Sequence, residues 1–301
     1  MEELKQVLEL GKTIMGGEDA YRERPIINHH YCPIISPLTM DVDSTASYIY
    51  CVENGYPVYG TIVPNAGVSA PMTLAGTVAL GNAEFLALAV LTQMIRPNTP
   101  VIYAVLSTAA DMRTGGYAPG AIETAMLQVA HSQMARFYNV PSGGYIGLTN
   151  SHLNDAQSGY ETGMGVTAAL LGGADLFNMG GLLSSLMAFD FAKAVIDNEI
   201  ALMLKRIAKG IKVNENTLAL DIIKEVGQGG NFMDHDHTLK HMRSEVFFPE
   251  IANRDMREIW ESSGKPDAHA RALAIAKRIL TKENPALFSE DIDKRIRERF
   301  P

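Results

Sequence analysis

The chain has 301 residues, of which 47% are hydrophobic, and a formal net charge of −8. This length allows a large core or one barrel-sized domain with additions, and we expect no membrane span from the apolar runs. The negative charge and the lack of a basic cluster argue against nucleic acid and anionic membranes as partners.

The predicted elements begin with an amphipathic helix in MEELKQVLELGK, which is not a signal peptide. Five short β-branched or aromatic runs follow, and each leads into a polar or glycine-rich turn and then a helix. We predict strands at 25–35 and within GYPVYGTIVPNAG, TPVIYAVLST, NVPSGGYIGL and ADLFNMGG. Helices are expected at about 73–95, 121–137, 158–171 and 191–209.

This alternation of strands and helices is typical of βα units and a parallel sheet. Loops that leave the carboxyl ends of parallel strands share one face, which carries the site in barrels built from such units. Here those loops are NAGVSAP, STAADMRTGG, LTNSHLNDAQ and GGLLSSLMAF. The returning segments, such as IRPNTP and FYNVP, are short and marked by proline. We therefore expect the functional face at the four longer loops.

Beyond Gly210 no further βα unit is recognisable. The segment SSGKPDAHARALAIAKRILTKE has the pattern of an amphipathic helix, and the end of the chain is strongly charged. We therefore divide the chain into a βα part at 1–209 and a helical C-terminal extension at 210–301. The extension is expected to pack on the βα part or on a partner subunit.

Two clusters of metal-ligand residue types can be weighed from sequence. In DHDHTLKH, His237 and His241 would share one helix face while His235 would not, so a helix start is favoured over a zinc site. Cys32 and Cys51 lack metal-type spacing and a base nearby in sequence, which indicates a reducing cytoplasm and no thiol nucleophile. We expect no protein-bound metal.

Aromatic residues lie on or near the ends of the five predicted strands, and Tyr117 lies in a loop of the functional face. Most aromatic side chains on such strands belong to the core. If several converge on one mouth, however, they can hold a quaternary ammonium through cation–π attraction. The strand aromatics are Tyr31, Tyr59, Tyr103, Tyr145 and Phe177.

Four long motifs, in order, resemble the trimethylamine methyltransferase superfamily: SAPMTLAGTVALGNAEFLALAVLTQMIRPNTPVIY, DMRTGGYAPGAIETAML, QMARFYNVPSGGYIG and DIIKEVGQGGNFMDHDHTLKHMRSE. The resemblance implies a (β/α)8 TIM-barrel type of α/β fold, with about five of the eight βα units present here. It also implies transfer of a methyl group from a methylated amine to the Co(I) of a separate corrinoid protein, as in methanogenesis and other one-carbon metabolism. The family's N-terminal portion has no counterpart in this chain.

The segment TNSHLNDAQSGYE aligns with the family segment that carries pyrrolysine in the trimethylamine-specific branch. Here that position falls at His152 or Leu153, so the resemblance implies the branch without pyrrolysine. Such members use quaternary amines such as glycine betaine, whose leaving group is a neutral tertiary amine and needs no general acid. Asn178 and Met179 lie about where betaine-type relatives have a histidine.

From this resemblance we name candidate site residues. His152 and Asn150 are the catalytic candidates. Arg113 is the residue suited to a substrate carboxylate, although a loop-stabilising pair with Asp111 is an equal alternative. The residues expected to bind substrate are Tyr103, Tyr117, Tyr145, Asp111, Arg113, Asp155 and Asn178.

Three functional hypotheses stay open at this point. The first is a corrinoid-dependent methyltransferase acting on a quaternary amine, assembled as a homo-oligomer. The second is a truncated relative without catalysis that serves as an interaction partner. The third is an unrelated metal-dependent barrel that uses the histidine cluster.

Overall fold

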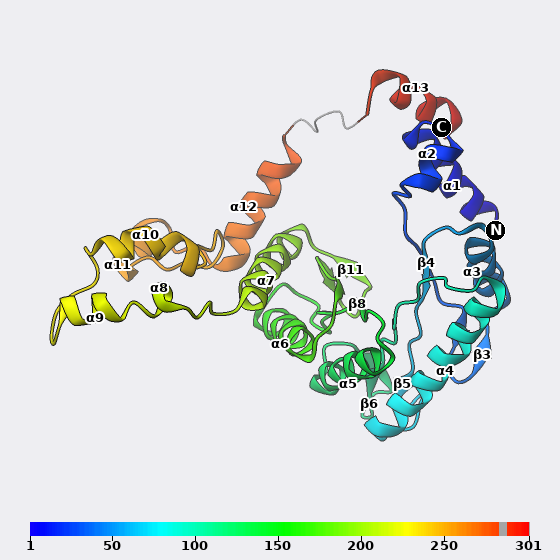
Figure 1. Cartoon of the computed structure of the whole chain (residues 1–301), viewed down its shortest axis with the longest axis horizontal. Helices are drawn as coiled ribbons and strands as arrows, with labels where there is room; N and C mark the ends of the chain where they lie inside the picture. The colour runs from blue at the N-terminus through cyan, green and yellow to red at the C-terminus, as the bar shows by residue number, and fades with distance from the viewer. Residues whose placement is uncertain (283–287, 301) are drawn as a thin grey trace.

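A computed structural model describes residues 1–282 and 288–300. Helices and short strands alternate over the first two thirds of the chain and form an α/β array (Figure 1). The helices of this part are α1 Glu2–Met15, α2 Glu18–Glu23, α3 Val42–Asn54, α4 Leu74–Ile95, α5 Ile122–Tyr138, α6 Ala156–Gly172 and α7 Phe191–Lys209. The remaining helices are α8 Glu215–Leu218, α9 Leu220–Val226, α10 Asp236–Glu245, α11 Arg257–Ser262, α12 Ala268–Leu280 and α13 Glu290–Arg299.

The strands are short and pair in parallel with their neighbours along the chain. Their bounds are β1 His29–Tyr31, β4 Val58–Gly60, β5 Asn65–Ala66, β6 Thr108–Asp111, β8 Gly143–Tyr145 and β9 Leu176–Asn178. β1 pairs with β4, β5 with β6, and β8 with β9, while single bridges join Ile62 to Val105 and Tyr103 to Ser142. Strand residues or single bridges therefore occur in each of the five predicted runs, and their pairing is parallel; in the third run, 99–108, they are limited to bridges at Tyr103 and Val105 and to Thr108. Among the described residues the small sheets do not close into a ring.

Antiparallel hairpins extend three of the connections. β2 Ile34–Ile35 pairs with β3 Thr39–Met40, and β10 Leu182–Leu183 pairs with β11 Ala188–Phe189. β7 Gly116–Ala118 turns back on β6. These hairpins follow parallel strands, so they lie at the strands' carboxyl ends.

Polar caps and glycines define the helices that link these strands. Asp41 accepts a hydrogen bond from the Ser44 N–H at 2.7 Å at the start of α3, and Asp190 accepts one from the Lys193 N–H at 2.6 Å at the start of α7. Gly173 ends α6 in the left-handed conformation, which glycine adopts without a side-chain clash. The predicted helices are confirmed, and the one expected at 191–209 has the predicted bounds.

The main core lies between the strands and helices α3, α4 and α5. Ile62 and Val105 project from the strands toward this helix layer, where they pack with Phe85 of α4. Among the described residues, α4 is the one helix long and apolar enough to cross a membrane, although we expect no span from the sequence. The inner side of α4 packs into this core.

A buried ion pair joins α6 and α7. Lys193 and Asp197 are each 1% exposed at the side chain, and the Lys193 Nζ lies 2.7 Å from Asp197 Oδ1. The same ammonium donates to Thr162 Oγ1 at 3.1 Å, and Asp197 Oδ2 accepts from the Gly181 N–H at 2.8 Å. Each charge therefore has several polar partners, as burial of charge demands.

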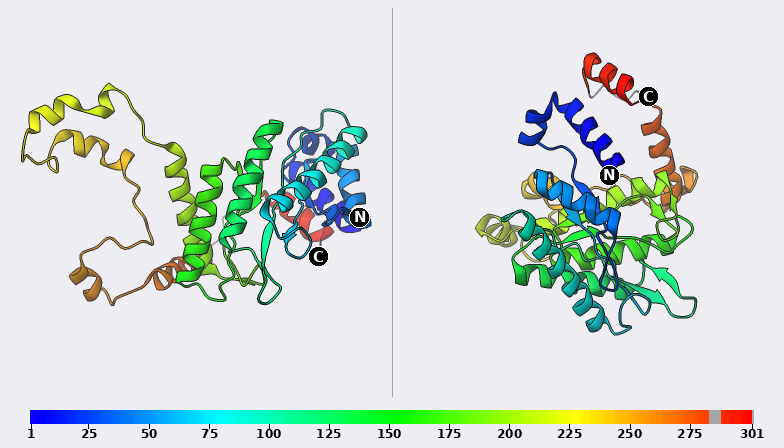
Figure 2. Two further views of the ribbon diagram at one scale, coloured as in Figure 1. Left: turned by 90° about the horizontal axis from the view of Figure 1, so that it is seen from below. Right: turned by 90° about the vertical axis from the view of Figure 1, so that its right-hand side faces the viewer.

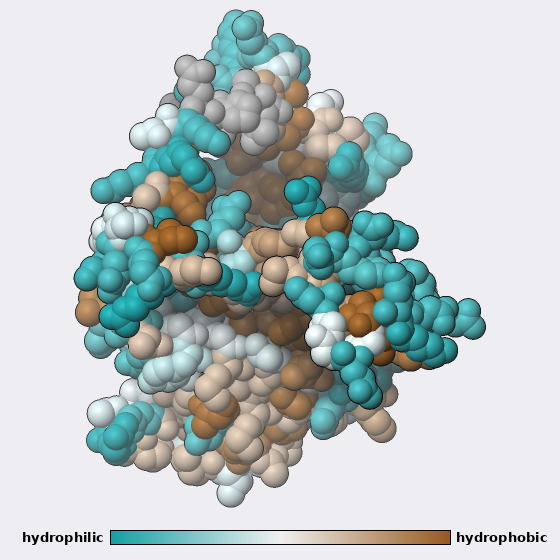
Figure 3. All heavy atoms as spheres, turned by 90° about the vertical axis from the view of Figure 1, so that its left-hand side faces the viewer, coloured by the Kyte–Doolittle hydropathy of each residue, from teal (hydrophilic) through white to brown (hydrophobic). Residues whose placement is uncertain are grey.

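Beyond α7, the named elements of the described residues are all helices. Helices α8 to α11 contain no buried residue and extend away from the array as an arm (Figure 2). Apolar side chains lie between charged ones on the side of the molecule that bears this arm (Figure 3). Glu199 of α7, itself buried, accepts hydrogen bonds from the N–H groups of Glu250, Ile251 and Ala252 at 2.6, 2.7 and 2.9 Å. This carboxylate anchors the end of the arm.

The last two helices return to the array. α12 packs on α7 through Ala272 and Leu273, and α13 lies against α1, where Arg299 pairs with Glu9 at 2.5 Å. Figure 1 shows α13 beside α1 and α2, near the first residues of the chain.

We predict that Lys193→Met destabilises the protein by about 3–5 kcal/mol, because it leaves the Asp197 carboxylate buried without its cation. Adding Asp197→Asn should restore most of this loss, because Asn can still accept from the Gly181 N–H. Denaturant unfolding of the parent, the single variants and the double variant measures the coupling. A double variant as unstable as the single one would contradict this account.

We also predict an acid-dependent loss of stability that originates at His131. This side chain is buried, its Nε2 lies 2.7 Å from Ser107 Oγ, and burial lowers its pKa to about 3. The unfolded chain binds a proton there below about pH 6.5, whereas the folded chain does not. The contribution is therefore complete above that pH and is lost as the pH falls toward 3. Thermal melts from pH 7 to 4 should show a shallower decline for His131→Phe, while His269→Gln on α12 should follow the parent.

Candidate functional site

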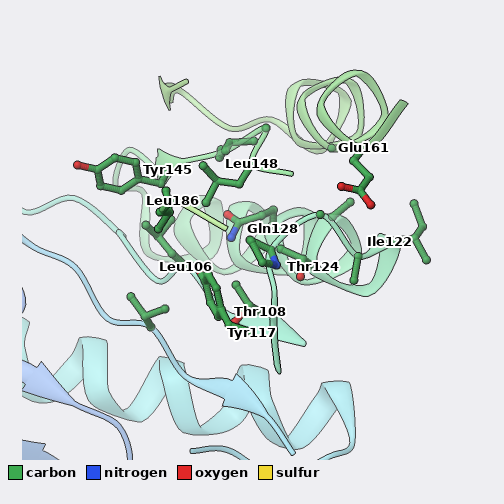
Figure 4. Close-up of a pocket in the computed structure, with 18 of the residues that line it drawn as sticks. Leu106, Thr108, Tyr117, Ile122, Thr124, Gln128, Tyr145, Leu148, Glu161 and Leu186 are labelled. Atoms are coloured by element: carbon green, nitrogen blue, oxygen red, sulfur yellow. The ribbon is translucent and has the colours of Figure 1, made fainter. Parts of the chain in front are cut away.

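The strands separate beside Tyr103 and Ser142, and a cavity occupies the seam between them. In the described residues the third and fourth strands pair through this one bridge, and Leu106 and Thr108 then diverge from Tyr145. The cavity has a volume of about 480 Å³ and extends between α5 and α6 (Figure 4). Its lining includes Leu106, Thr108, Tyr117, Ile122, Ala125, Gln128, Tyr145, Leu148, Glu161, Met164 and Leu186.

One face of the strand series carries a small aromatic cluster. The rings of His30 and Tyr59 stack at 4.8 Å, and the ring of Tyr145 lies 5.6 Å from that of His30. Asn178 donates from Nδ2 to the Tyr59 hydroxyl at 3.1 Å. Thr61 Oγ1 lies within hydrogen-bond reach of His30 Nε2, and burial lowers the pKa of His30. The imidazole is therefore neutral near pH 7.

Tyr103 lies on the opposite face of the same strands. It is 1% exposed, its ring lies 4.3 Å from that of Phe85, and its hydroxyl donates to Asn82 Oδ1 at 3.1 Å. Side chains alternate between the two faces of a strand, so Tyr103 points to the helix layer and Tyr145 to the cavity. The structure brings Tyr145 and Asn178 to one face but does not bring Tyr103 to it.

Tyr117 reaches the cavity from β7. Its ring lies near Thr108 and below the segment that carries Leu148 (Figure 4). Burial raises the pKa of its phenol, so the hydroxyl stays protonated at neutral pH. Tyr117 and Tyr145 therefore line one cavity from two separate elements.

Asn150 connects three loops at the carboxyl ends of the strands. Its Oδ1 accepts from the Gly120 N–H at 2.9 Å, and its Nδ2 donates to the Tyr117 carbonyl at 2.9 Å and to Ser185 Oγ at 2.8 Å. Both ends of the amide are thus engaged within the protein. In this arrangement Asn150 positions Tyr117 by holding its backbone.

His152 and Asp155 lie beside the cavity and do not line it. His152 is exposed, and its Nδ1 is 2.9 Å from Ser184 Oγ. Asp155 is the N-cap of α6, where it accepts from the Ser158 N–H at 3.0 Å and from Ser151 Oγ at 2.8 Å. The Ser158 N–H and the Ser151 hydroxyl lower the pKa of this carboxyl.

Asp111 and Arg113 pair with each other at the tip of the β6–β7 hairpin. The Arg113 Nε and Nη2 donate to the two carboxylate oxygens at 2.9 and 2.6 Å, and the Arg113 N–H donates at 3.0 Å. The guanidinium holds the pKa of Asp111 at about 2, although both groups face solvent. This is the loop-stabilising alternative, and neither side chain lines the cavity.

Glu161 is a site residue that the motif analysis does not single out. It accepts hydrogen bonds from Thr149 Oγ1 at 2.5 Å, from the Asn150 N–H at 2.8 Å and from Gln157 Nε2 at 2.8 Å. Among the described residues that line the cavity, it is the only carboxylate. A signal was present in the sequence, because Glu161 is the single charged residue of α6.

The histidine cluster of the extension lies in the arm, far along the chain from this cavity. His235 caps α10 by accepting from the His237 N–H at 3.0 Å, and the rings of His237 and His241 lie 4.4 Å apart. The helix start and the shared face of His237 and His241 are as predicted, and His235 is the N-cap. Within the described residues no three side chains of metal-ligand type converge.

Comparison of the sequence with known proteins shows the family to which this chain belongs. The model of the trimethylamine methyltransferase (MTTB) family matches residues 1–300. A trimethylamine methyltransferase MttB of Desulfitobacterium hafniense (strain DSM 10664 / DCB-2) is 35% identical over 293 residues, which cover 97% of this chain and 59% of the relative. A glycine betaine methyltransferase of Desulfitobacterium hafniense (strain Y51) is 35% identical over 296 residues, covering 98% of this chain and 61% of the relative.

A more distant match is the trimethylamine methyltransferase MttB of Methanosarcina thermophila. It is 31% identical over 299 residues, covering 97% of this chain and 61% of the relative. The chain thus spans about three fifths of the length of these curated relatives. On the family match and these identities together, the chain belongs to the trimethylamine methyltransferase family.

Proposed function

We propose that this chain takes part in moving a methyl group from a methylated amine, specifically a quaternary amine such as a betaine, to the Co(I) of a separate corrinoid protein. The observation that carries the proposal is the composition of the cavity: apolar walls, the rings of Tyr117 and Tyr145, and one carboxylate, Glu161. Such a lining suits a permanent cation, which is attracted by aromatic faces and by an uncompensated negative charge. The family names support the methylated amine as substrate class.

Transfer of a methyl group from a quaternary amine needs no proton donor. When an N–CH3 bond of a quaternary ammonium breaks, the bonding pair remains on nitrogen and a neutral tertiary amine leaves. The corrinoid supplies the nucleophilic metal that receives the methyl group. The protein's part is then to hold the cation, orient one N-methyl group and exclude water. The phenol of Tyr117, whose pKa is raised by burial, and a neutral His30 fit this requirement.

We further propose that 1–209 forms part of a (β/α)8 barrel and that 210–301 is its helical extension. The parallel pairing in chain order and the cavity at the carboxyl ends of the strands support this assignment. The corrinoid protein would approach the loops at these ends. These loops expose several large apolar side chains, namely Leu38, Met72, Met112, Leu153 and Met187, which fit a broad apolar contact.

A substrate carboxylate has no cationic partner among the described residues that line this cavity. Arg113, the candidate from sequence, is paired with Asp111 outside it. Substrates with a trimethylammonium group and no carboxylate, such as choline, should therefore be included beside the betaines in any assay.

The second candidate function is a catalytically inactive relative that acts as an interaction partner. The open series of strands favours it, since β1 and β9 have no second neighbour among the described residues. The decisive assay mixes the protein with cob(I)alamin and a panel of betaines, carnitine and choline, and follows methylcobalamin by absorbance. Turnover supports the first proposal. Its absence, beside an active full-length relative, favours the second.

Binding can be tested apart from turnover. We predict that Tyr145→Leu weakens binding of choline or glycine betaine about 2- to 30-fold, the range expected for loss of one cation–π contact. Tyr145→Phe keeps the ring and should bind like the parent. Titration calorimetry measures both variants. Equal losses in the two would mean that the hydroxyl, rather than the aromatic face, holds the ligand.

Glu161→Gln provides a test of the charge. We expect it to weaken binding of choline about tenfold, which corresponds to about 1.4 kcal/mol, because the carboxylate attracts the cation across an apolar cavity. Binding of 3,3-dimethylbutanol, the uncharged isostere of choline, should change far less. Glu123→Gln on α5 is the control. If both ligands weaken equally, the role of Glu161 is confined to holding Thr149 and Asn150.

A further inference from the structure

Gln128 is a polar residue on the inward side of α5, where most buried positions of a helix are apolar or small. It is 6% exposed, with the buried Ala125 about one turn before it and the buried Ser132 about one turn after it. A glutamine at such a position loses most of its contact with bulk water. This loss costs free energy unless the side-chain amide finds hydrogen-bond partners.

Two other polar side chains on the inward side of α5 have such partners within the protein. Thr124 Oγ1 donates to the Ala118 carbonyl at 3.1 Å and accepts from the Ala109 N–H at 3.2 Å. His131 Nε2 lies 2.7 Å from Ser107 Oγ. The folded chain therefore supplies hydrogen bonds on this side of the helix where it needs them.

The side-chain amide of Gln128 is different, because it has no hydrogen-bond partner among the described residues. The hydrogen bond that Gln128 accepts from Ser132 Oγ, at 2.9 Å, reaches its backbone carbonyl. Its side chain projects from α5 into the cavity, with Leu148 on one side and Tyr117 on the other (Figure 4). Two N–H donors and one carbonyl acceptor are therefore available to a ligand in the cavity.

The charges around the cavity decide which ligand group suits this amide. The described lining residues include one carboxylate, Glu161, and neither Lys nor Arg. Burial lowers the pKa of His30, so its imidazole adds no positive charge near pH 7. A ligand carboxylate would thus be buried beside a negative charge without a cation to pair with, whereas a hydroxyl or an ester carbonyl has no charge to desolvate.

We propose that Gln128 determines specificity by hydrogen bonding to an uncharged oxygen of the substrate, so that the cavity takes quaternary amines with a hydroxyl or carbonyl group in preference to those with a carboxylate. This inference rests on the proposed function, in which Tyr117, Tyr145 and Glu161 hold the ammonium group. The amide N–H donates to the substrate oxygen, and a hydroxyl can also donate to the amide carbonyl. A substrate with a methyl group at that place displaces water from the amide without replacing its hydrogen bonds, and therefore binds more weakly.

Two pairs of ligands separate the hydrogen bond from the attraction of the cation. Propyltrimethylammonium is choline with a methyl group in place of the hydroxyl, and glycine betaine methyl ester is glycine betaine with its carboxylate made neutral. In calorimetric titrations the parent should bind choline about 5- to 30-fold more tightly than propyltrimethylammonium, because the latter leaves a buried amide unpaired. It should bind the ester at least about tenfold more tightly than glycine betaine.

Gln128→Met tests the residue itself, because it keeps an unbranched side chain of similar length and removes the amide. It should weaken binding of choline about 5- to 30-fold and change that of propyltrimethylammonium by less than about twofold, so that the preference disappears. Gln133→Met, at an exposed position of the same helix, is the matched control and should bind like the parent. Thermal melts should show Gln128→Met at least as stable as the parent, since its amide has no protein partner to lose.

The possible failures have different meanings. The role of Gln128 is overturned, and the proposed function stands, if the parent binds choline and propyltrimethylammonium equally, if it binds glycine betaine more tightly than the ester, or if Gln128→Met retains the preference for choline. A marked loss of stability in Gln128→Met, with both ligands weakened alike, would assign the residue a structural role instead. If the parent binds none of the four ligands, the quaternary-amine function itself fails, and the specificity inferred for Gln128 fails with it.

Discussion

The alternation of side chains along a strand is the constraint on which this structure depends. Each strand is only two to four residues long, so a single register decides which side chains face the helices and which face the cavity. Ile62, Tyr103 and Val105 build the core with α4, while Tyr59 and Tyr145 gather on the other face with His30. A shift by one residue would exchange these two sets and remove both the core and the aromatic cluster.

The cavity also depends on hydrogen bonds between polar groups at its edge. Asn150 holds the Gly120 N–H and the Tyr117 carbonyl, and Glu161 holds the Asn150 N–H and the Thr149 hydroxyl. The two residues form one continuous hydrogen-bonded connection from α6 to the loop that presents Tyr117. Because the space between Gly120 and Glu161 does not admit a β-carbon at position 120, glycine allows this close approach. The position of the Tyr117 ring is thus set by the Asn150 amide and, through it, by the Glu161 carboxylate.

Much of the fold could be predicted from sequence, because its strong signals are local. Apolar runs bounded by Gly and Pro located the five strands, and helical periodicity located 73–95, 121–137, 158–171 and 191–209. Which tyrosines share a face could not be predicted, because apolar runs covered on both sides carry no alternating pattern from which to read the register. Asn150 and Asp155 could be named from sequence as polar loop residues, but the partners of Asn150 lie in segments about thirty residues away. Glu161 could not be identified from sequence, because it lies within a helix and its place in the site depends on its contacts with Thr149 and Gly120 in the folded chain.

The order in which the strands pair has a consequence for how the molecule assembles. β1 pairs with β4, β5 with β6, and β8 with β9, so each parallel pair joins elements that are neighbours in the series. Each unit can dock on the preceding one as the chain leaves the ribosome, without waiting for a distant partner. The contact of Arg299 with Glu9 is of the opposite kind, since it joins residues 290 positions apart. It forms only after synthesis has passed residue 299, and it draws the two ends of an otherwise sequential array together.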